Sequence, residues 1–292
     1  MQLSVVNKKM GEGAAKNFKI AFAQTYPKFG EVEANVEEAL KLIRSVEADL
    51  VVLPELFNTG YVFLSREEVR RFAEEIPNGE TCRILIEESG RMRKTIVAGL
   101  AEKAGEALYN SVVLVSKGRF VGLYRKLHLF DREKLLFNKG NLEPKVYTVD
   151  GARIGMLICF DWLFPEVWRL LALKGAEIVA HPSTLVLPYY CQRAMLARSF
   201  ENHIYTITAN RVGEEKRGSY HLKYTGRSQI VSPKMEVLAS ASEDQVECKA
   251  VQVDLELARN KKVTELNDIF KDRRPRFYRL LTRPSHLAKP LP

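Results

Sequence analysis

Short, continuously apolar runs alternate along the chain with segments in which apolar side chains recur every three or four residues. The first pattern is typical of buried strands and the second of amphipathic helices. In the first half of the chain, helices are predicted for residues 35–46 and 80–92. Strands are predicted for residues 17–24, 49–53, 95–100, 110–115 and 120–124.

The middle of the chain carries the clearest single unit. A buried strand over residues 152–158 precedes a helix that begins at Pro165 and closes at Gly175, because proline suits a first helical turn and glycine a helix end. Another buried strand follows at residues 177–182. This strand, helix and strand in about thirty residues predict a parallel crossover, and therefore an α/β sheet.

The remaining segments predict one helix and several further strands. We expect the charged, glycine-containing segment 213–226 to be a mobile loop near the pocket, and a polar loop to run from Asp131 to Gly140. So many mixed strands imply an α/β fold with two mixed sheets packed together and helices outside. The helix is predicted at residues 190–202 and the strands at residues 204–210, 228–231, 236–239 and 249–254.

Composition is consistent with one large domain. The chain has 292 residues, 46% of them hydrophobic, and no window approaches the roughly 18 apolar residues that a membrane span needs. We expect a flexible leader over residues 1–16, one domain over 17–270, and a cytoplasmic location.

The four cysteines show no C-x-x-C pairing, so we expect reduced thiols, no disulfides and no metal site.

The net charge of +9 is concentrated in residues 271–292, which hold seven Lys or Arg residues against one Asp. The rest of the chain is only weakly basic. Aromatic and leucine side chains accompany the basic ones, and no nucleic-acid-binding motif does. We therefore expect this basic tail to dock on the domain or at a subunit interface, and we expect no nucleic-acid partner.

Three predicted strands end in residues that carry chemistry, namely Glu55, Lys126 and Cys159. In open α/β sheets ligands bind beyond the carboxyl ends of strands, so these side chains are expected to meet in one pocket. The turn before a helix would favour a reactive thiolate at Cys159. Each residue also has a plain structural interpretation: a helix cap or arginine partner, a solvated lysine, and a small buried hydrophobe.

The segments around these residues resemble a known family. Leu-Pro-Glu55-Leu-Phe-Asn-Thr-Gly-Tyr, Tyr-Arg-Lys126-Leu-His-Leu-Phe and Ile-Cys159-Phe-Asp-Trp-Leu-Phe-Pro-Glu resemble, in this order, the signature segments of the nitrilase superfamily of carbon–nitrogen hydrolases. The likeness extends over about residues 17–275. It implies a four-layer α-β-β-α sandwich, a homodimer or higher homo-oligomer, and a C-terminal segment that reaches across the interface.

The resemblance also implies roles for individual residues. Cys159 would be the nucleophile that forms a thioester, and Glu55 the acid–base that moves its proton to the departing nitrogen. Lys126 and the backbone N–H of Phe160 would hold the oxyanion. Glu133 matches a second glutamate that many members use to orient the substrate or to support the lysine. No cofactor is implied.

The residues after the nucleophile bear on the substrate. The nitrile-hydrolysing branch generally has Trp-Glu after its cysteine, whereas this chain has Phe160-Asp161. Trp162 and Leu163 stand where enzymes of N-carbamoyl amino acids tend to carry arginines. A small neutral or aliphatic amide is therefore predicted, with a nitrile or an N-carbamoyl amine as alternatives. We expect Trp162, Phe164 and Tyr61 to be pocket walls, although each could equally be core.

Three other functions compete with this prediction. A papain-like hydrolase would use His181 or His128 with Cys159, but the sequence around the cysteine is not of that type, and we interpret His128 as a packing residue. A nucleic-acid-binding protein would use the basic tail. A glutaminase that feeds a synthetase is disfavoured because no Gly-rich phosphate loop follows.

Overall fold

The structure, a computed structural model, describes residues 17–283. Their contacts define a large compact unit that continues to Asn260 and a second unit that starts at Lys261. The leader predicted for residues 1–16 and the end of the basic tail, residues 284–292, lie outside the described residues. The domain boundaries drawn from the sequence remain predictions.

The first sheet of the large unit has six strands in the order β14-β1-β2-β3-β4-β5. The neighbours β1, β2 and β3 run parallel, and the other pairs are antiparallel. The strands β1 and β3 flank the short, fully buried β2, and Glu55 lies in the turn that follows β2. The six strands are β1 (Asn17–Gln24), β2 (Leu50–Val52), β3 (Thr95–Ala104), β4 (Ala107–Ser116), β5 (Arg119–Arg125) and β14 (Glu247–Asp254).

The second sheet also has six strands, in the order β13-β12-β9-β8-β7-β6. Its centre, β7-β8-β9, is parallel, as the predicted crossover requires, and its outer pairs are antiparallel. These strands are β6 (Val146–Val149), β7 (Ala152–Met156), β8 (Ile178–Pro182), β9 (Tyr205–Ala209), β12 (Gln229–Val231) and β13 (Val237–Ser240).

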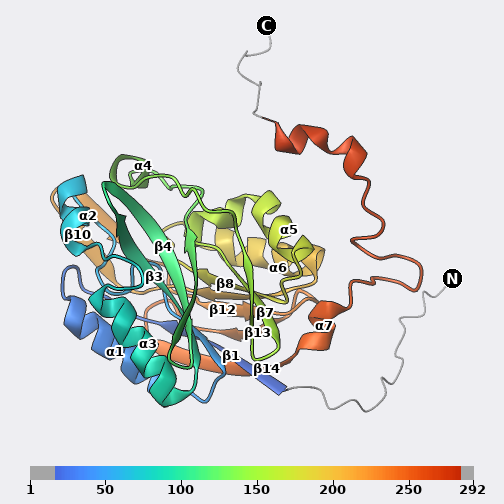
Figure 1. Cartoon of the computed structure of the whole chain (residues 1–292), viewed down its shortest axis with the longest axis horizontal. Helices are drawn as coiled ribbons and strands as arrows, with labels where there is room; N and C mark the ends of the chain where they lie inside the picture. Colours follow the sequence, from blue (N-terminus) through green and yellow to red (C-terminus); the bar gives the residue numbers. More distant parts are fainter. Residues whose placement is uncertain (1–16, 284–292) are drawn as a thin grey trace, which may run out of the picture. The chain divides into compact units, whose positions relative to one another are not determined.

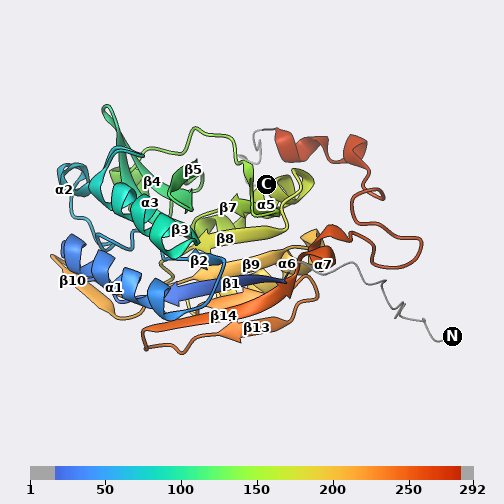
Figure 2. The same cartoon turned by 60° about the horizontal axis from the view of Figure 1, so that its bottom comes forward.

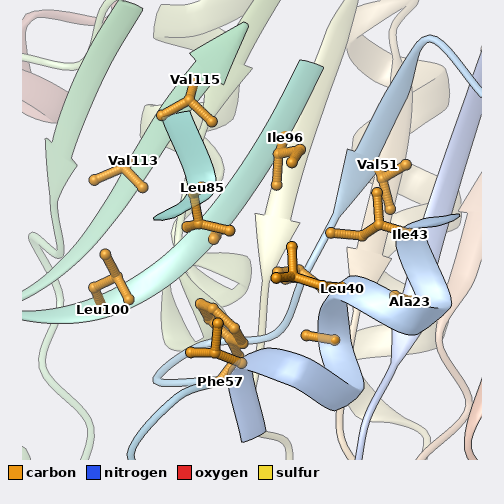
Figure 3. Packing of buried hydrophobic residues seen from close by; sticks show 14 of the residues in the cluster. Ala23, Leu40, Ile43, Val51, Phe57, Leu85, Ile96, Leu100, Val113 and Val115 are labelled. Carbon is orange, nitrogen blue, oxygen red and sulfur yellow. The ribbon is translucent and has the colours of Figure 1, made fainter. Parts of the chain in front are cut away.

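Two helices cover the outer face of the first sheet, α1 (Val32–Ser45) and α3 (Glu80–Met92). Their apolar faces pack on alternate side chains of β1 to β4, as Figure 3 shows for Leu40, Ile43 and Leu85. The spacing of apolar residues every three or four positions produces this face, and its burial in turn holds the helices on the sheet.

Helices α5 (Pro165–Leu173) and α6 (Tyr190–Asn202) cover the second sheet (Figures 1 and 2). Helix α5 lies so close to β7 that a Cβ on Gly155 would come within 2.9 Å of the Leu171 side chain. The inner faces of the sheets meet through β1 against β9 and β2 and β3 against β8. The predicted order of layers, α-β-β-α, is therefore confirmed for this unit.

The segment 213–226 differs from its prediction as a mobile loop. It forms an antiparallel hairpin of β10 (Glu214–Arg217) and β11 (Tyr220–Lys223). The reason is a charged residue that points inward: Glu215 is buried, pairs with Arg211, and accepts backbone hydrogen bonds from Tyr61 and Val62. The hairpin is thus fastened to the loop that follows Glu55.

Several short elements have no counterpart in the predicted pattern. The predicted polar loop after Asp131 contains the single-turn helix α4 (Glu133–Leu136). Helices α2 (Arg66–Phe72) and α7 (Leu255–Arg259) are also short, and too few turns present an apolar face for a period to show. No helix of the described chain is long and apolar enough to cross a membrane.

Candidate active site

Three side chains from distant parts of the chain meet at the carboxyl ends of the strands. Glu55 lies in the turn after β2, Lys126 follows β5, and Cys159 begins a short 3-10 helix, η1 (Cys159–Leu163), after β7. Their exposed fractions are 0%, 1% and 5%. Lys126 Nζ donates to Glu55 Oε1 at 2.7 Å. The meeting of strand ends expected from the sequence is therefore present for the acid and the ammonium.

The Lys126 ammonium lies between two buried carboxylates. Besides Glu55, it donates to Glu133 Oε1 at 2.7 Å. The Tyr61 hydroxyl donates to the same oxygen at 2.7 Å, and the Phe130 backbone N–H donates to Glu133 Oε2 at 3.0 Å. Glu133 thus accepts hydrogen bonds from three donors. It is the first residue of the single-turn helix α4, which positions it beside the lysine.

The two oxygens of Glu55 have different surroundings. Oε1 accepts from Lys126 Nζ and from Asn110 Nδ2, each at 2.7 Å. Oε2 is buried and has no hydrogen-bond partner among the residues that the structure describes. A buried acceptor without a donor is costly, so this oxygen is available to a proton that a ligand or a neighbouring group can supply.

The backbone at Cys159 is strained. Its φ is +40°, in the left-handed region that costs a residue with a side chain about 1–2 kcal/mol. Two side chains hold the turn: Asp161 Oδ2 accepts from the Ile158 N–H at 2.9 Å, and His181 Nε2 lies 2.8 Å from the Cys159 carbonyl oxygen. Because a carbonyl only accepts, the proton of the neutral His181 ring is on Nε2.

The thiol of Cys159 is linked to Glu55 through one residue. Cys159 Sγ donates to the carbonyl oxygen of Thr184 at 3.6 Å, and Thr184 Oγ1 donates to the carbonyl oxygen of Glu55 at 3.1 Å. The segment that follows β8 therefore fixes the nucleophile relative to the turn that carries the acid.

The electrostatic environment contradicts the expected thiolate. Burial raises the pKa of the Cys159 thiol well above its ordinary value of 9.0, and the negative charge of Glu55 raises it further. Lys126 acts in the opposite direction but is already paired with two carboxylates. The helix expected to stabilise the anion begins at Pro165, as predicted, but Cys159 lies well before it at the start of η1, and the effect of a helix terminus fades within about one turn. These effects favour a neutral thiol at rest, and a neutral thiol needs a base before it can act as a nucleophile.

The same cluster determines the charges of its other members. Burial alone would lower the pKa of Lys126, but Glu133 and Glu55 raise it above its ordinary value, so the ammonium is kept. Burial raises the pKa of Glu133 to about 7, against the opposing effect of Lys126. Burial also raises the pKa of Tyr61, so its hydroxyl remains a donor to Glu133.

A pocket opens at Cys159. Phe130, Phe160, Trp162 and Thr184 line it with the segment 185–187, and none of these described lining residues is charged. Trp162 thus lies in the wall of this pocket, while the oxyanion role of the Phe160 backbone N–H stays a prediction. Tyr61, which was also expected as a wall, is not among the described lining residues, and its hydroxyl donates to Glu133. Phe164 stacks on His128 with ring centroids 3.6 Å apart, which agrees with a packing role for His128.

Asp161 connects the nucleophile turn to the segment of Lys126. It is fully buried, and it accepts from the Tyr124 hydroxyl at 2.8 Å. Its other oxygen lies 2.7 Å from His128 Nδ1. Because Tyr124 and His128 each lie two residues from Lys126, this carboxylate ties the lysine to the turn of Cys159.

Sequence reasoning assigned no role to Asn110, Thr184 or Asp161. Each is a polar residue inside an apolar run or at one end of it, as in Tyr-Asn110-Ser-Val-Val-Leu-Val. Polar side chains in such positions are unusual unless they have a buried partner. That signal marks them as candidates, but the partner could be identified only from the structure.

Comparison with curated proteins gives relatives over most of the chain. The chain is 51% identical to a nitrilase of Pyrococcus abyssi over 263 residues, which is 89% of this chain and 98% of the relative. It is 33% identical to an (R)-stereoselective amidase of a Pseudomonas species, over 88% and 91% of the two chains. It is 30% identical to N-carbamoylputrescine amidase of Arabidopsis thaliana, over 86% and 91%.

Solved structures and a family model agree with these relatives. A carbon–nitrogen hydrolase from Helicobacter pylori G27 superposes with a TM-score of 0.82 at 25% identity, over 91% of this chain and 99% of the other. An amidase from a Nesterenkonia species shares the fold, with a TM-score of 0.74 at 24% identity over 90% and 95%. Residues 19–262 match the family model described as carbon-nitrogen hydrolase, and the chain is an enzyme that belongs to this family.

Proposed function

We propose that this enzyme hydrolyses the carbon–nitrogen bond of a small uncharged amide through a thioester on Cys159 and releases ammonia. One observation carries the proposal: a neutral thiol that lines an apolar pocket is buried in one electrostatic cluster with a charged ammonium and with a carboxylate, one oxygen of which has no partner among the described residues. A nucleophile, a proton carrier and an oxyanion partner are what amide cleavage requires.

In the first half of the reaction, the Cys159 sulphur attacks the amide carbon while its proton passes to Glu55 Oε2. The carbonyl oxygen becomes an oxyanion, which the Lys126 ammonium and the backbone N–H of Phe160 would stabilise. The carbon–nitrogen bond then breaks, and the nitrogen takes the proton from Glu55. Ammonia leaves and the acyl group stays on the sulphur as a thioester.

In the second half, water attacks the thioester carbon and gives a proton to Glu55. The carbon–sulphur bond breaks, the proton returns to the sulphur, and the carboxylic acid leaves. Glu133 would support both halves by keeping Lys126 charged and in place, since it shares the ammonium with Glu55. Tyr61 would hold Glu133 by its hydrogen bond.

The pocket supports a small, uncharged, apolar acyl group. Its walls include Phe130, Phe160 and Trp162, and no Lys, Arg, Asp or Glu lies among the described lining residues. A substrate carboxylate or ammonium would lose its hydration there without gaining a partner. This argues against dicarboxylic monoamides and charged N-carbamoyl amines, although one 30% identical relative is named N-carbamoylputrescine amidase.

A nitrile is the second candidate, because the relative that is 51% identical over nearly its whole length is named a nitrilase. The same groups suit this reaction. The Cys159 sulphur would add to the nitrile carbon, and Glu55 would pass the thiol proton to the nitrogen. Water would then add, ammonia would leave, and the thioester would be hydrolysed as for an amide. One nitrile consumes two water molecules.

Ammonia release across a substrate panel tests the proposal. The panel contains short aliphatic amides, their nitriles, dicarboxylic monoamides and carbamoyl amines, each with the wild type and with Cys159→Ala. We expect the fastest release from short aliphatic amides, none from Cys159→Ala, and an acyl mass on the Cys159 peptide after acid quenching. Faster release from nitriles would favour the second candidate, and activity in Cys159→Ala would end both.

We also infer a homo-oligomer, at least a dimer, in a reducing compartment such as the cytoplasm. The C-terminal unit exposes apolar side chains such as Phe277 and Leu280, which supports the first inference. All four cysteines are free, which supports the second. Light scattering should give a multiple of the monomer mass, and a thiol assay after denaturation should count four thiols. A monomer or a disulfide would contradict them.

A further inference from the structure

Asn110 is buried in the middle of the catalytic cluster, and the mechanism above gives it no part. It lies on β4 with 0% of its surface exposed. Its side-chain Nδ2 donates to Glu55 Oε1 at 2.7 Å, and its backbone carbonyl accepts from the Lys126 N–H at 2.9 Å. One residue of the sheet thus contacts both the acid and the lysine.

These contacts make the two oxygens of Glu55 unequal. Oε1 accepts from two donors, Asn110 Nδ2 and Lys126 Nζ, whereas Oε2 has no partner among the described residues. An oxygen that already accepts two strong hydrogen bonds is a poorer site for a proton than one that accepts none. Since Asn110 adds its own donor to Oε1 only, it increases this difference.

We propose that Asn110 is a positioning residue that directs the proton of the Cys159 thiol to Glu55 Oε2. The inference rests on the proposed function, in which Glu55 is the proton carrier. In the attack the S–H bond breaks, the proton binds Oε2, and the sulphur forms its bond to the substrate carbon. Without the amide donor, the carboxylate loses one of the two hydrogen bonds that fix its orientation.

The loss of this donor has a measurable consequence. A hydrogen bond to a carboxylate favours the ionised form, so its removal makes the carboxylate take up a proton at higher pH. The titratable groups that face Glu55 are Lys126, Glu133, Cys159, Tyr61 and Tyr224. In a plot of the reaction rate of Cys159 against pH, the acid limb is the low-pH range in which the rate falls. Because Glu55 and Glu133 share the ammonium, this limb reports both carboxyl groups together.

The test measures the alkylation rate of Cys159 by iodoacetamide as a function of pH, followed by the mass of the Cys159 peptide. In this reaction the sulphur–carbon bond forms, iodide leaves and the thiol proton goes to the base, so no physiological substrate is needed. The variants are Asn110→Ala and Asn110→Asp. Asn58→Ala is the matched control, because Asn58 is also buried and its Nδ2 makes a hydrogen bond away from Glu55, to Thr81.

We expect the midpoint of the acid limb of the alkylation rate to rise by about one pH unit in Asn110→Ala. It should rise further in Asn110→Asp, where a second carboxylate faces Glu55 Oε1. In Asn58→Ala the limb should stay in place even if the melting temperature falls. If Asn110→Ala does not fold, the isosteric Asn110→Asp decides. An unmoved limb in the folded Asn110 variants would overturn the inference.

Failure of the proposed function would give a different result. It would show as wild-type protein that releases no ammonia from any substrate of the panel, or as activity that survives Cys159→Ala. The positioning role makes one more prediction: for any substrate that is turned over, Asn110→Ala lowers kcat and leaves KM nearly unchanged. The reason is that Asn110 is not among the described residues that line the pocket.

Discussion

The two sheets contribute unlike halves to the site. The first sheet supplies Glu55 and Lys126, side chains that hold one another by charge at 2.7 Å. The second supplies Cys159, which has no charged hydrogen-bond partner among residues 17–283 and is held by the backbone geometry of its turn. The comparison shows that one half depends on electrostatic pairing, while the other depends on hydrogen bonds to the main chain.

The three buried ions of the charged half cost desolvation free energy. Lys126 and the carboxylates of Glu55 and Glu133 are almost completely buried, so each ion has lost its hydration. Such a cluster is stable only while its charges compensate one another, and removal of one partner leaves an unpaired charge in a low dielectric.

At Cys159 itself the second half avoids that cost, because the thiol and the ring that holds its carbonyl are neutral. Cys159 keeps its proton, and burial lowers the pKa of His181 to about 4, so the ring that holds the Cys159 carbonyl is uncharged at neutral pH. The strain at Cys159 is the cost on this side, and hydrogen bonds from its neighbours offset it.

Lys126→Met should have the largest effect, because it breaks the charged half. We expect turnover to fall by at least about 10³-fold through loss of the oxyanion partner. We also expect the free energy of unfolding to fall by about 3–5 kcal/mol, since two carboxylates lose their ammonium. Urea denaturation and ammonia release measure the two effects.

A second substitution sharpens this prediction. In Lys126→Met/Glu133→Gln one of the stranded charges is gone, so part of the lost stability should return while turnover stays absent. Equal stability of the single and double variants would show that charge compensation does not hold this half of the site together.

Asp161→Asn breaks the link between the halves. An amide cannot accept all the hydrogen bonds that Asp161 receives from Ile158, Tyr124 and His128. The misplaced turn should lower kcat roughly 10- to 100-fold, with little change in KM. Tyr124→Phe removes only one of the bonds and should have a smaller effect, and equal losses would argue against the linking role.

Cys159→Gly and Cys159→Ala together test the strain of the nucleophile half. Both abolish turnover, but glycine adopts the observed φ of +40° without the penalty that a Cβ brings. We expect the glycine variant to be more stable by up to about 1 kcal/mol, since the entropy that glycine loses on folding offsets part of the relief. A glycine variant less stable than the alanine variant would contradict a strained turn.

The sequence predicted the regular parts of the fold well. Helices α3 and α6 have the predicted bounds, Glu80–Met92 and Tyr190–Asn202. The hairpin of β10 and β11 was missed because the charges and glycines of segment 213–226 predicted a loop, whereas Glu215 is buried. Its burial depends on Arg211 and on backbone donors from a distant loop.

The site was predictable in its residues more than in its electrostatics. Glu55 and Lys126 follow strands of the first sheet and Cys159 follows a strand of the second, so the packing of the two sheets brings their strand ends together. The state of the thiol was not predictable, because the burial of Cys159 beside the Glu55 carboxylate is a three-dimensional fact. Asn110 was missed for a similar reason, since its partner lies 55 residues away in the sequence.

The central claim is that Glu55 activates a neutral thiol, and the ionisation of Cys159 tests it most directly. The measurement is the thiolate absorbance near 240 nm as pH is raised, taken as the difference between the wild type and Cys159→Ala. Burial and the Glu55 carboxylate disfavour the anion, so we predict no thiolate signal at neutral pH and a midpoint above the ordinary 9.0. A midpoint below about 7.5, as in proteins with preformed thiolates, would contradict the account.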